Sequence, residues 1–157
     1  MPKFDFNPAQ VDAGFLKCLP KDYYELKITG LKSFISKKTN SDTGADESNY
    51  GVRVMAEVVE GDEAGQKVIL NMYQHSEGSR KFCKPFQMAV YGYETNSESQ
   101  ADFDLMAASL SWGFDTDTGA VDDGWANMKG KRVKGFAEIQ ISASGRESNN
   151  WGQWVRV

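Results

Sequence analysis

The sequence predicts a mainly β protein with five strands and a helical insertion between the third and fourth strands. Three observations predict this class. Apolar and polar residues alternate in the first and last thirds of the chain, glycine-containing turns separate those stretches, and a helical period occurs only in the middle. The chain has 157 residues, of which 40% are hydrophobic and 25% are charged. We therefore expect one domain over residues 1–157 that needs neither a disulfide nor a metal ion to fold.

Alternation marks the first three strands. In residues 23–31, Tyr24, Leu26 and Ile28 share one face, as in a half-buried strand. Residues 50–59 alternate in the same way, and a turn with two glycines at 60–65 leads into a third strand at 67–73. Residues 50–73 therefore predict a β-hairpin.

Polar and helical stretches separate these strands from the last two. Residues 1–15 predict an N-terminal arm, and the polar residues 36–49 predict a mobile loop. Residues 85–127 predict helices and an acidic loop. Pro85 suits the first turn of a short helix that ends near Tyr93, and a capping signal at Ser99 precedes a second helix of about three turns.

The chain then returns to strands at 132–141 and 151–157. Three strands, then helical material, then two strands is the layout of the OB fold, a five-stranded barrel that binds oligonucleotides or oligosaccharides on one face. The expected fold class is therefore mainly β, an OB-fold barrel with a helical insertion between strands 3 and 4. The same pattern also fits other small β-rich folds.

Charge is distributed unevenly along the chain. The net charge is −4, but residues 94–128 contain eight acids and no base, and residues 129–157 contain six bases and two acids. A basic segment can bind phosphates locally while an acidic segment limits indiscriminate binding. Uneven surface charge without a binding role is an equally good interpretation of this feature alone.

Several classes of function find no support in the sequence. His75 is the only histidine, and there is no glycine-rich phosphate loop, so we expect no enzyme and no cofactor. Asp115 and Asp117 lack the glutamate that a calcium loop requires, so no metal is expected. No run of 18 apolar residues and no secretory h-region is present, which predicts a cytoplasmic protein without a membrane segment.

The candidate binding site lies on the last two strands. The alternation of residues 132–141 predicts that Val133, Ala137 and Ile139 point to the core. Arg132, Lys134 and Phe136 then share the opposite face. On the final strand, Trp154 and Arg156 are expected to share one face. Rings that stack on bases beside cations that hold phosphates are typical of single-strand binding proteins.

The full predicted nucleic-acid site is Lys131, Arg132, Lys134, Phe136, Trp154 and Arg156, with Tyr50, Arg53, Lys67 and Tyr73 as second-tier candidates. The alternative interpretation is that Phe136 and Trp154 lie beneath the helices or in a dimer contact.

Three segments also resemble a known family. They are Leu19–Ile28, the turn region Val54–Val68, and Met128–Val133 followed by Asn149-Asn150 and a tryptophan-rich end. In order and over roughly residues 16–75 and 128–157, they resemble small phage proteins of the OB-fold single-stranded-DNA-binding type, often described only as a domain of unknown function. The resemblance implies an OB barrel, single-stranded DNA binding and no catalysis. The chain departs from many such proteins because it ends without an acidic tail, and its residues 97–127 have no counterpart that we can identify.

The expected function is therefore largely sequence-independent single-stranded DNA binding in phage DNA replication and recombination, in the cytoplasm of the host cell. Phage replication or recombination proteins as partners, and a homo-oligomer, are left open. The alternative is a phage structural or inhibitory module that binds protein. A small nuclease or nucleotide hydrolase is the least favoured alternative, because the acids it would use fall in one loop: Asp115, Asp117, Asp122 and Asp123.

Overall fold

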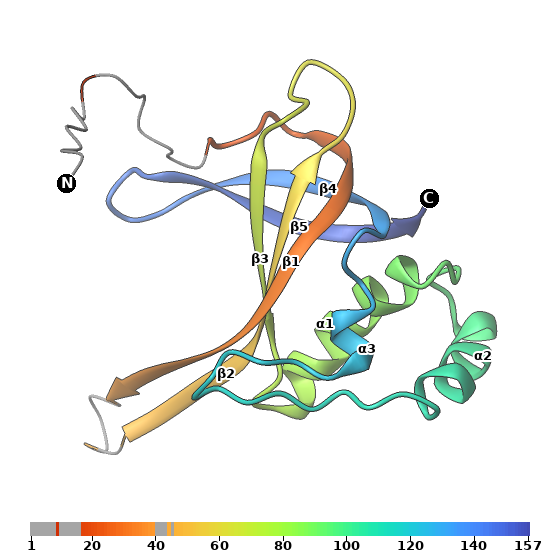
Figure 1. Ribbon diagram of the computed structural model, residues 1–157. Coiled ribbons are helices and arrows are strands. Elements are labelled where there is room, and N and C mark those ends of the chain that lie inside the picture. The colour runs from red at the N-terminus through yellow and green to blue at the C-terminus, as the bar shows by residue number, and fades with distance from the viewer. Residues whose placement is uncertain (1–8, 10–16, 40–43, 45) are drawn as a thin grey trace, which may run out of the picture.

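Five antiparallel strands form the centre of the computed structural model, which describes residues 17–39, 44 and 46–157 together with Ala9 (Figure 1). The strands are β1 Asp22–Thr39, β2 Asp46–Val58, β3 Lys67–Tyr73, β4 Arg132–Ile141 and β5 Glu147–Arg156. The helices are α1 Glu77–Val90, α2 Ser97–Ala107 and α3 Asp123–Ala126. The strand order is β3-β2-β1-β4-β5. The prediction of a mainly β fold with helices between the third and fourth strands is confirmed.

The prediction of a closed barrel is wrong. β3 and β5 are the two edge strands of the sheet, and no ladder joins them. Helix α1 bridges the two edges instead. The Cys83 thiol of α1 donates to the carbonyl of Tyr73 in β3 at 3.4 Å, and the ring of Phe86 packs against Trp154 of β5 with centroids 4.9 Å apart. The helix therefore buries apolar surface that strand pairing would seal in a closed barrel.

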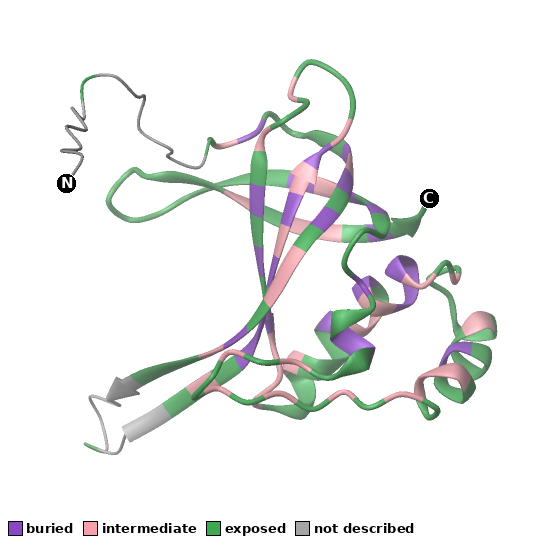
Figure 2. Cartoon of the chain, viewed as in Figure 1, coloured by how far each residue is buried: buried purple, intermediate pink, exposed green. Residues whose placement is uncertain are grey.

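The core lies on the inner face of the sheet, beneath α1 and α3 (Figure 2). Tyr24, Leu26 and Ile28 are buried, as the alternation predicts, and so are the even-numbered residues of β2 from 52 to 58. Ile139 was expected to continue this inner row, but it is 44% exposed. Ile139 is exposed because the β4–β5 hairpin extends beyond the core, so its last residues have nothing to pack against.

The predicted loop at 36–49 is shorter than expected. β1 continues to Thr39 and β2 begins at Asp46, so polar residues such as Ser36 and Asn49 pair across a hairpin. Backbone ladders need no apolar side chains, and this hairpin therefore extends past the core (Figure 1). Residues 40–43 and 45, and almost all of the predicted arm at 1–15, lie outside the described residues.

The helices also begin earlier than predicted. The Ser76 side chain accepts from the Ser79 N–H at 3.1 Å and starts α1, so Pro85 lies inside the helix rather than in its first turn. Pro85 has no backbone N–H and therefore removes one hydrogen bond of the helix. Pro85 is exposed, so water can replace that bond at a lower free-energy cost. Asn96, not Ser99, caps α2, because its side chain accepts from the Ser99 N–H at 2.8 Å. No helix in the described part of the chain is long and apolar enough to cross a membrane.

Candidate nucleic-acid interface

The outer face of the sheet, opposite the core, carries most of the cationic residues of the sheet. Alternation and register place six bases there: Lys27, Lys32, Arg53, Lys67, Arg132 and Lys134. Three acids share this surface: Glu25, Glu57 and Glu138. An excess of three positive charges contrasts with the net charge of −4 for the whole chain. We call this surface, with its aromatic residues, the basic face.

One aromatic pair lies at the β1–β4 end of the basic face. Tyr23 and Phe136 are register partners, and their ring centroids are 4.8 Å apart. The ammonium of Lys21 lies 5.9 Å from the centroid of the Phe136 ring. The Tyr23 hydroxyl donates to Oε1 of Gln153 at 2.6 Å, which fixes one edge of the pair while 42% of Tyr23 stays exposed. Accessible rings beside a cation are suited to stacking on nucleobases.

A second aromatic pair lies on the same face near the far end of β3. Phe34 and Tyr73 flank Gly51 of β2, and their ring centroids are 5.4 Å apart. A Cβ at Gly51 would lie 2.1 Å from the carbonyl oxygen of Met72, so a side chain there would disturb the strands. The guanidinium of Arg53 lies 5.2 Å from the Phe34 centroid, and its Nε donates to Oδ1 of Asn71 at 3.1 Å. This end therefore also combines two rings with one cation.

Most of the cations between the two ring pairs are available to bind phosphates. Arg132 forms an ion pair with Glu25 at 3.2 Å. Within the described part of the chain, Lys27, Lys32 and Lys134 have no ion pair, and all three are exposed. Exposed lysines without an ion-pair partner can contact phosphates without first breaking a salt bridge.

Six of the ten predicted site residues lie on the basic face. The structure brings Arg132, Lys134 and Phe136 to one side of β4, as the alternation indicates, and it places Arg53, Lys67 and Tyr73 on the same side of the sheet. Their role in binding remains a prediction.

The expected exposure of Trp154 is wrong. Trp154 is 5% exposed, and it stacks on Trp151 with centroids 6.0 Å apart and an interplanar angle of 12°. It covers Gly135, where a Cβ would lie 2.4 Å from its ring. A bulge explains the error. β5 has one extra residue opposite Lys134–Phe136, and Gln153 adopts a φ of 49°, so the alternation of β5 changes phase.

Three further predicted residues lie away from the basic face. Arg156 donates to the carbonyl of Gly92 at 3.3 Å and pairs with Glu94 at 3.1 Å, on the helical side of the sheet. Lys131 lies over the ring of Tyr91 at 5.4 Å. Tyr50 pairs in register with Ile35 on the opposite side of the hairpin, and its ring lies 6.1 Å from that of Phe114. The predicted grouping of Lys131 and Arg156 with Phe136 is therefore wrong, and the second-tier candidate Tyr50 does not join the basic face.

Sequence reasoning missed Phe34 and Lys32. Both follow residue 31, where the predicted strand stopped, yet the alternation continues through Ser33, which is buried, and Phe34, which faces outward. Extending the period of Tyr24, Leu26 and Ile28 would have placed both residues on the inner face, because a bulge between Ile28 and Gly30 shifts the phase of the strand.

Outside the basic face, the described part of the chain offers few groups that could bind a metal ion. No group of three or more His, Cys, Asp or Glu residues there could hold a metal ion. His75 lies between Tyr73 and Tyr50, with ring centroids 5.6 and 6.2 Å away, and its Nδ1 is buried without a hydrogen-bond partner.

A scan against protein-family models returns no match for the chain, and a search of curated proteins likewise finds no relative.

Proposed function

We propose that the protein binds single-stranded DNA on the basic face with little base specificity. The observation that carries this proposal is the outer face itself, where six cations lie between two pairs of aromatic rings. Cations that follow a phosphate backbone and rings that accept any base are the two parts of a sequence-tolerant single-strand site.

The dimensions of the face suit an extended strand. Tyr23 and Phe34 are eleven positions apart along β1, which corresponds to about 36 Å of strand. Bases would stack at the two ring pairs, and the phosphates between them would contact Lys27, Lys32 and Lys134. Both projecting hairpins, β1–β2 and β4–β5, extend beyond the core (Figure 1).

The proposal extends to the fold family and to the biological role. A β1-β2-β3 meander, a helix, and a β4-β5 hairpin paired back to β1 follow the chain order of the OB fold, so we assign the protein to an open form of that fold. The resemblance to phage single-strand binding proteins supports a non-catalytic role in DNA replication and recombination in the cytoplasm of an infected cell.

Fluorescence anisotropy of labelled oligo-dT tests the proposal. Single-stranded oligonucleotides should bind more tightly than the duplex, and the double variant Phe34→Ala with Phe136→Ala should weaken binding by about 10²-fold, at roughly 1–3 kcal/mol for each stacked base. The matched control is Phe82→Ala, which removes an exposed ring of α1 and should leave oligo-dT binding unchanged. Equal binding of single strand and duplex, or no binding at low salt, would refute the proposal.

A second candidate function is protein binding. It is favoured by two exposed apolar side chains that line the same pocket: Phe82 is 68% exposed and Ile69 is 42% exposed. Such residues are typical of protein contacts when they lie together.

A further inference from the structure

A groove runs along the open side of the sheet, between the edge strand β3 and the β4–β5 hairpin. Its larger part, about 560 Å³, is lined by residues 69–73 of β3, by Gly78, Ser79, Phe82 and Cys83 of α1, and by Asn149, Asn150 and Trp151 of β5. A second part of about 390 Å³ shares Ile69, Asn149 and Trp151 with the first and continues to Arg146. We call the two parts together the edge groove.

The β3 wall of the edge groove presents unpaired backbone groups. Gln74 N–H donates to the carbonyl of Tyr50 at 2.8 Å, which sets the phase of the β2–β3 ladder. In an antiparallel pair only every second residue bonds to the neighbouring strand. The N–H and C=O groups of Ile69 and Asn71 therefore point away from β2 and into the groove. An unpaired edge of this kind is a template for another extended polypeptide.

Side chains give the groove an apolar floor and a basic end. Trp154 forms part of the floor, and Phe82 and Trp151 line the sides. Lys67 and Arg146 line the far end, together with Glu147, and neither cation has an ion pair in the part of the chain that the structure describes. Lys17, also at this end, is already paired with Glu63 at 2.8 Å.

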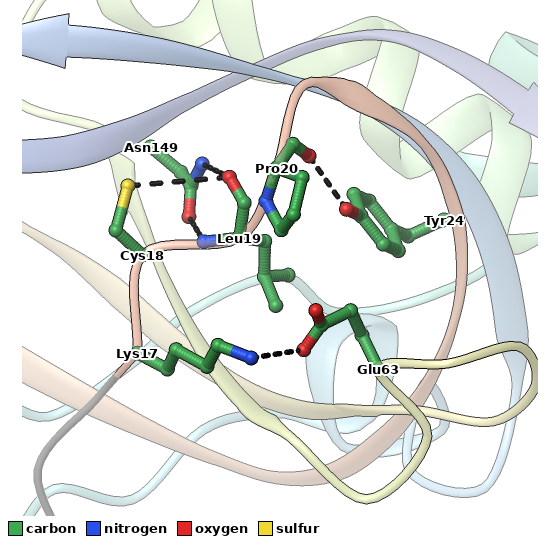
Figure 3. A network of polar contacts seen from close by, with 7 residues as sticks. All are labelled: Lys17, Cys18, Leu19, Pro20, Tyr24, Glu63 and Asn149. Carbon is green, nitrogen blue, oxygen red and sulfur yellow. Dashed lines mark hydrogen bonds and ion pairs between the residues drawn. The ribbon is translucent and has the colours of Figure 1, made fainter.

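The β5 wall is held in place by the chain that precedes β1 (Figure 3). Asn149 accepts from the N–H of Leu19 at 2.8 Å and donates to the carbonyl of the same residue at 2.9 Å. Leu19 is buried, and the Tyr24 hydroxyl donates to the carbonyl of Pro20. The two walls of the groove are thus fixed on opposite sides, β3 by its ladder to β2 and β5 by this network. A fixed groove lowers the ordering cost of binding.

We propose that the edge groove binds an extended peptide of alternating aromatic and acidic residues, which adds to β3 as a further strand. Alternate side chains of a strand point to opposite faces. The aromatic set would enter the apolar floor, and the acidic set would lie toward Lys67 and Arg146. Unpaired peptide groups spaced along β3 match a polypeptide backbone, whereas a phosphodiester backbone has no N–H donors. The proposal therefore concerns a protein partner and does not depend on DNA binding at the basic face.

The test uses a synthetic seven-residue peptide, the length of β3, in which aspartate alternates with phenylalanine. Calorimetry with the full chain should detect binding that weakens as salt rises. The control peptide has the same sequence, but alternate backbone nitrogens are methylated and cannot donate hydrogen bonds. It should bind at least about 10-fold more weakly, which corresponds to the loss of one or two hydrogen bonds. Equal binding of the two peptides would overturn strand addition.

A protein variant separates this site from the basic face. Ile69→Pro removes a donor that faces the groove and leaves the β2–β3 ladder intact, as is tolerated on an edge strand. It should lower peptide affinity by about 10-fold while thermal stability and oligo-dT binding stay near those of the wild type. The Lys67→Gln variant should reduce the salt dependence of peptide binding. No peptide binding at about 1 mM would contradict the proposal and leave the basic face unaffected.

Discussion

Removal of three cations from the basic face should reduce DNA affinity and its salt dependence by a calculable amount. The variant replaces Lys32, Arg53 and Lys134 with glutamine. Each of these residues is exposed and has no ion pair among the described residues, so their loss should leave the fold intact. Each phosphate contact on a single strand contributes about 0.7 to the slope of log K against log salt. The slope should therefore become shallower by about 2, and affinity at about 50 mM salt should fall by about 10²- to 10³-fold.

The control variant carries the same change in net charge on helix α1. Arg80, Lys81 and Lys84 are replaced with glutamine, which removes two exposed ion pairs worth at most about 1 kcal/mol each. Anisotropy titrations of labelled oligo-dT between about 50 and 200 mM salt measure both slopes. An unchanged slope in the first variant would show that these three cations do not contact phosphates. The same loss in both variants would show that general charge rather than the basic face governs binding.

The remaining predictions concern the core. Trp154→Ala should lower the free energy of unfolding by about 3–5 kcal/mol in urea, because the ring is buried; a loss below about 1 kcal/mol would contradict its place in the core. Gly135→Ala should also destabilise, since its Cβ would lie 2.4 Å from that ring, whereas Gly78→Ala, which meets open space in α1, should be neutral or stabilising. Burial raises the pKa of Cys83 from 9.0 to about 11. Because the folded state then holds this proton more tightly, stability should fall as pH rises from 9 to about 11. At pH 8 a thiol reagent should label Cys18 well before Cys83, and equal labelling rates would contradict the burial of Cys83.

Strand positions and faces were largely predictable from the sequence, because burial of one side imposes a period of two. The third and fourth strands match their predicted bounds, and the inner residues of β1 and β2 are those that the alternation indicated. The pattern failed where a single residue shifts the phase. The bulge at Gln153 turns Trp154 into the core, and no propensity rule places a positive φ on glutamine.

The candidate site was predictable only in part, for related reasons. Phe136 and Lys134 follow from one uninterrupted strand, β4, so their shared face could be read from the sequence. Phe34 lies beyond the bulge of β1, and its partner Tyr73 reaches it only across Gly51, a contact between three strands. Pairing of strands distant in sequence determines such contacts, and local pattern does not encode it.

Photocrosslinking tests the central claim most directly. An oligo-dT that carries a photoreactive thymine analogue is irradiated with the protein, and the crosslinked residues are identified by mass spectrometry. The account predicts crosslinks at Tyr23, Phe34 or Phe136, on the outer face of the sheet. Crosslinks confined to the helices, or to the edge groove at Phe82 and Trp151, would contradict it.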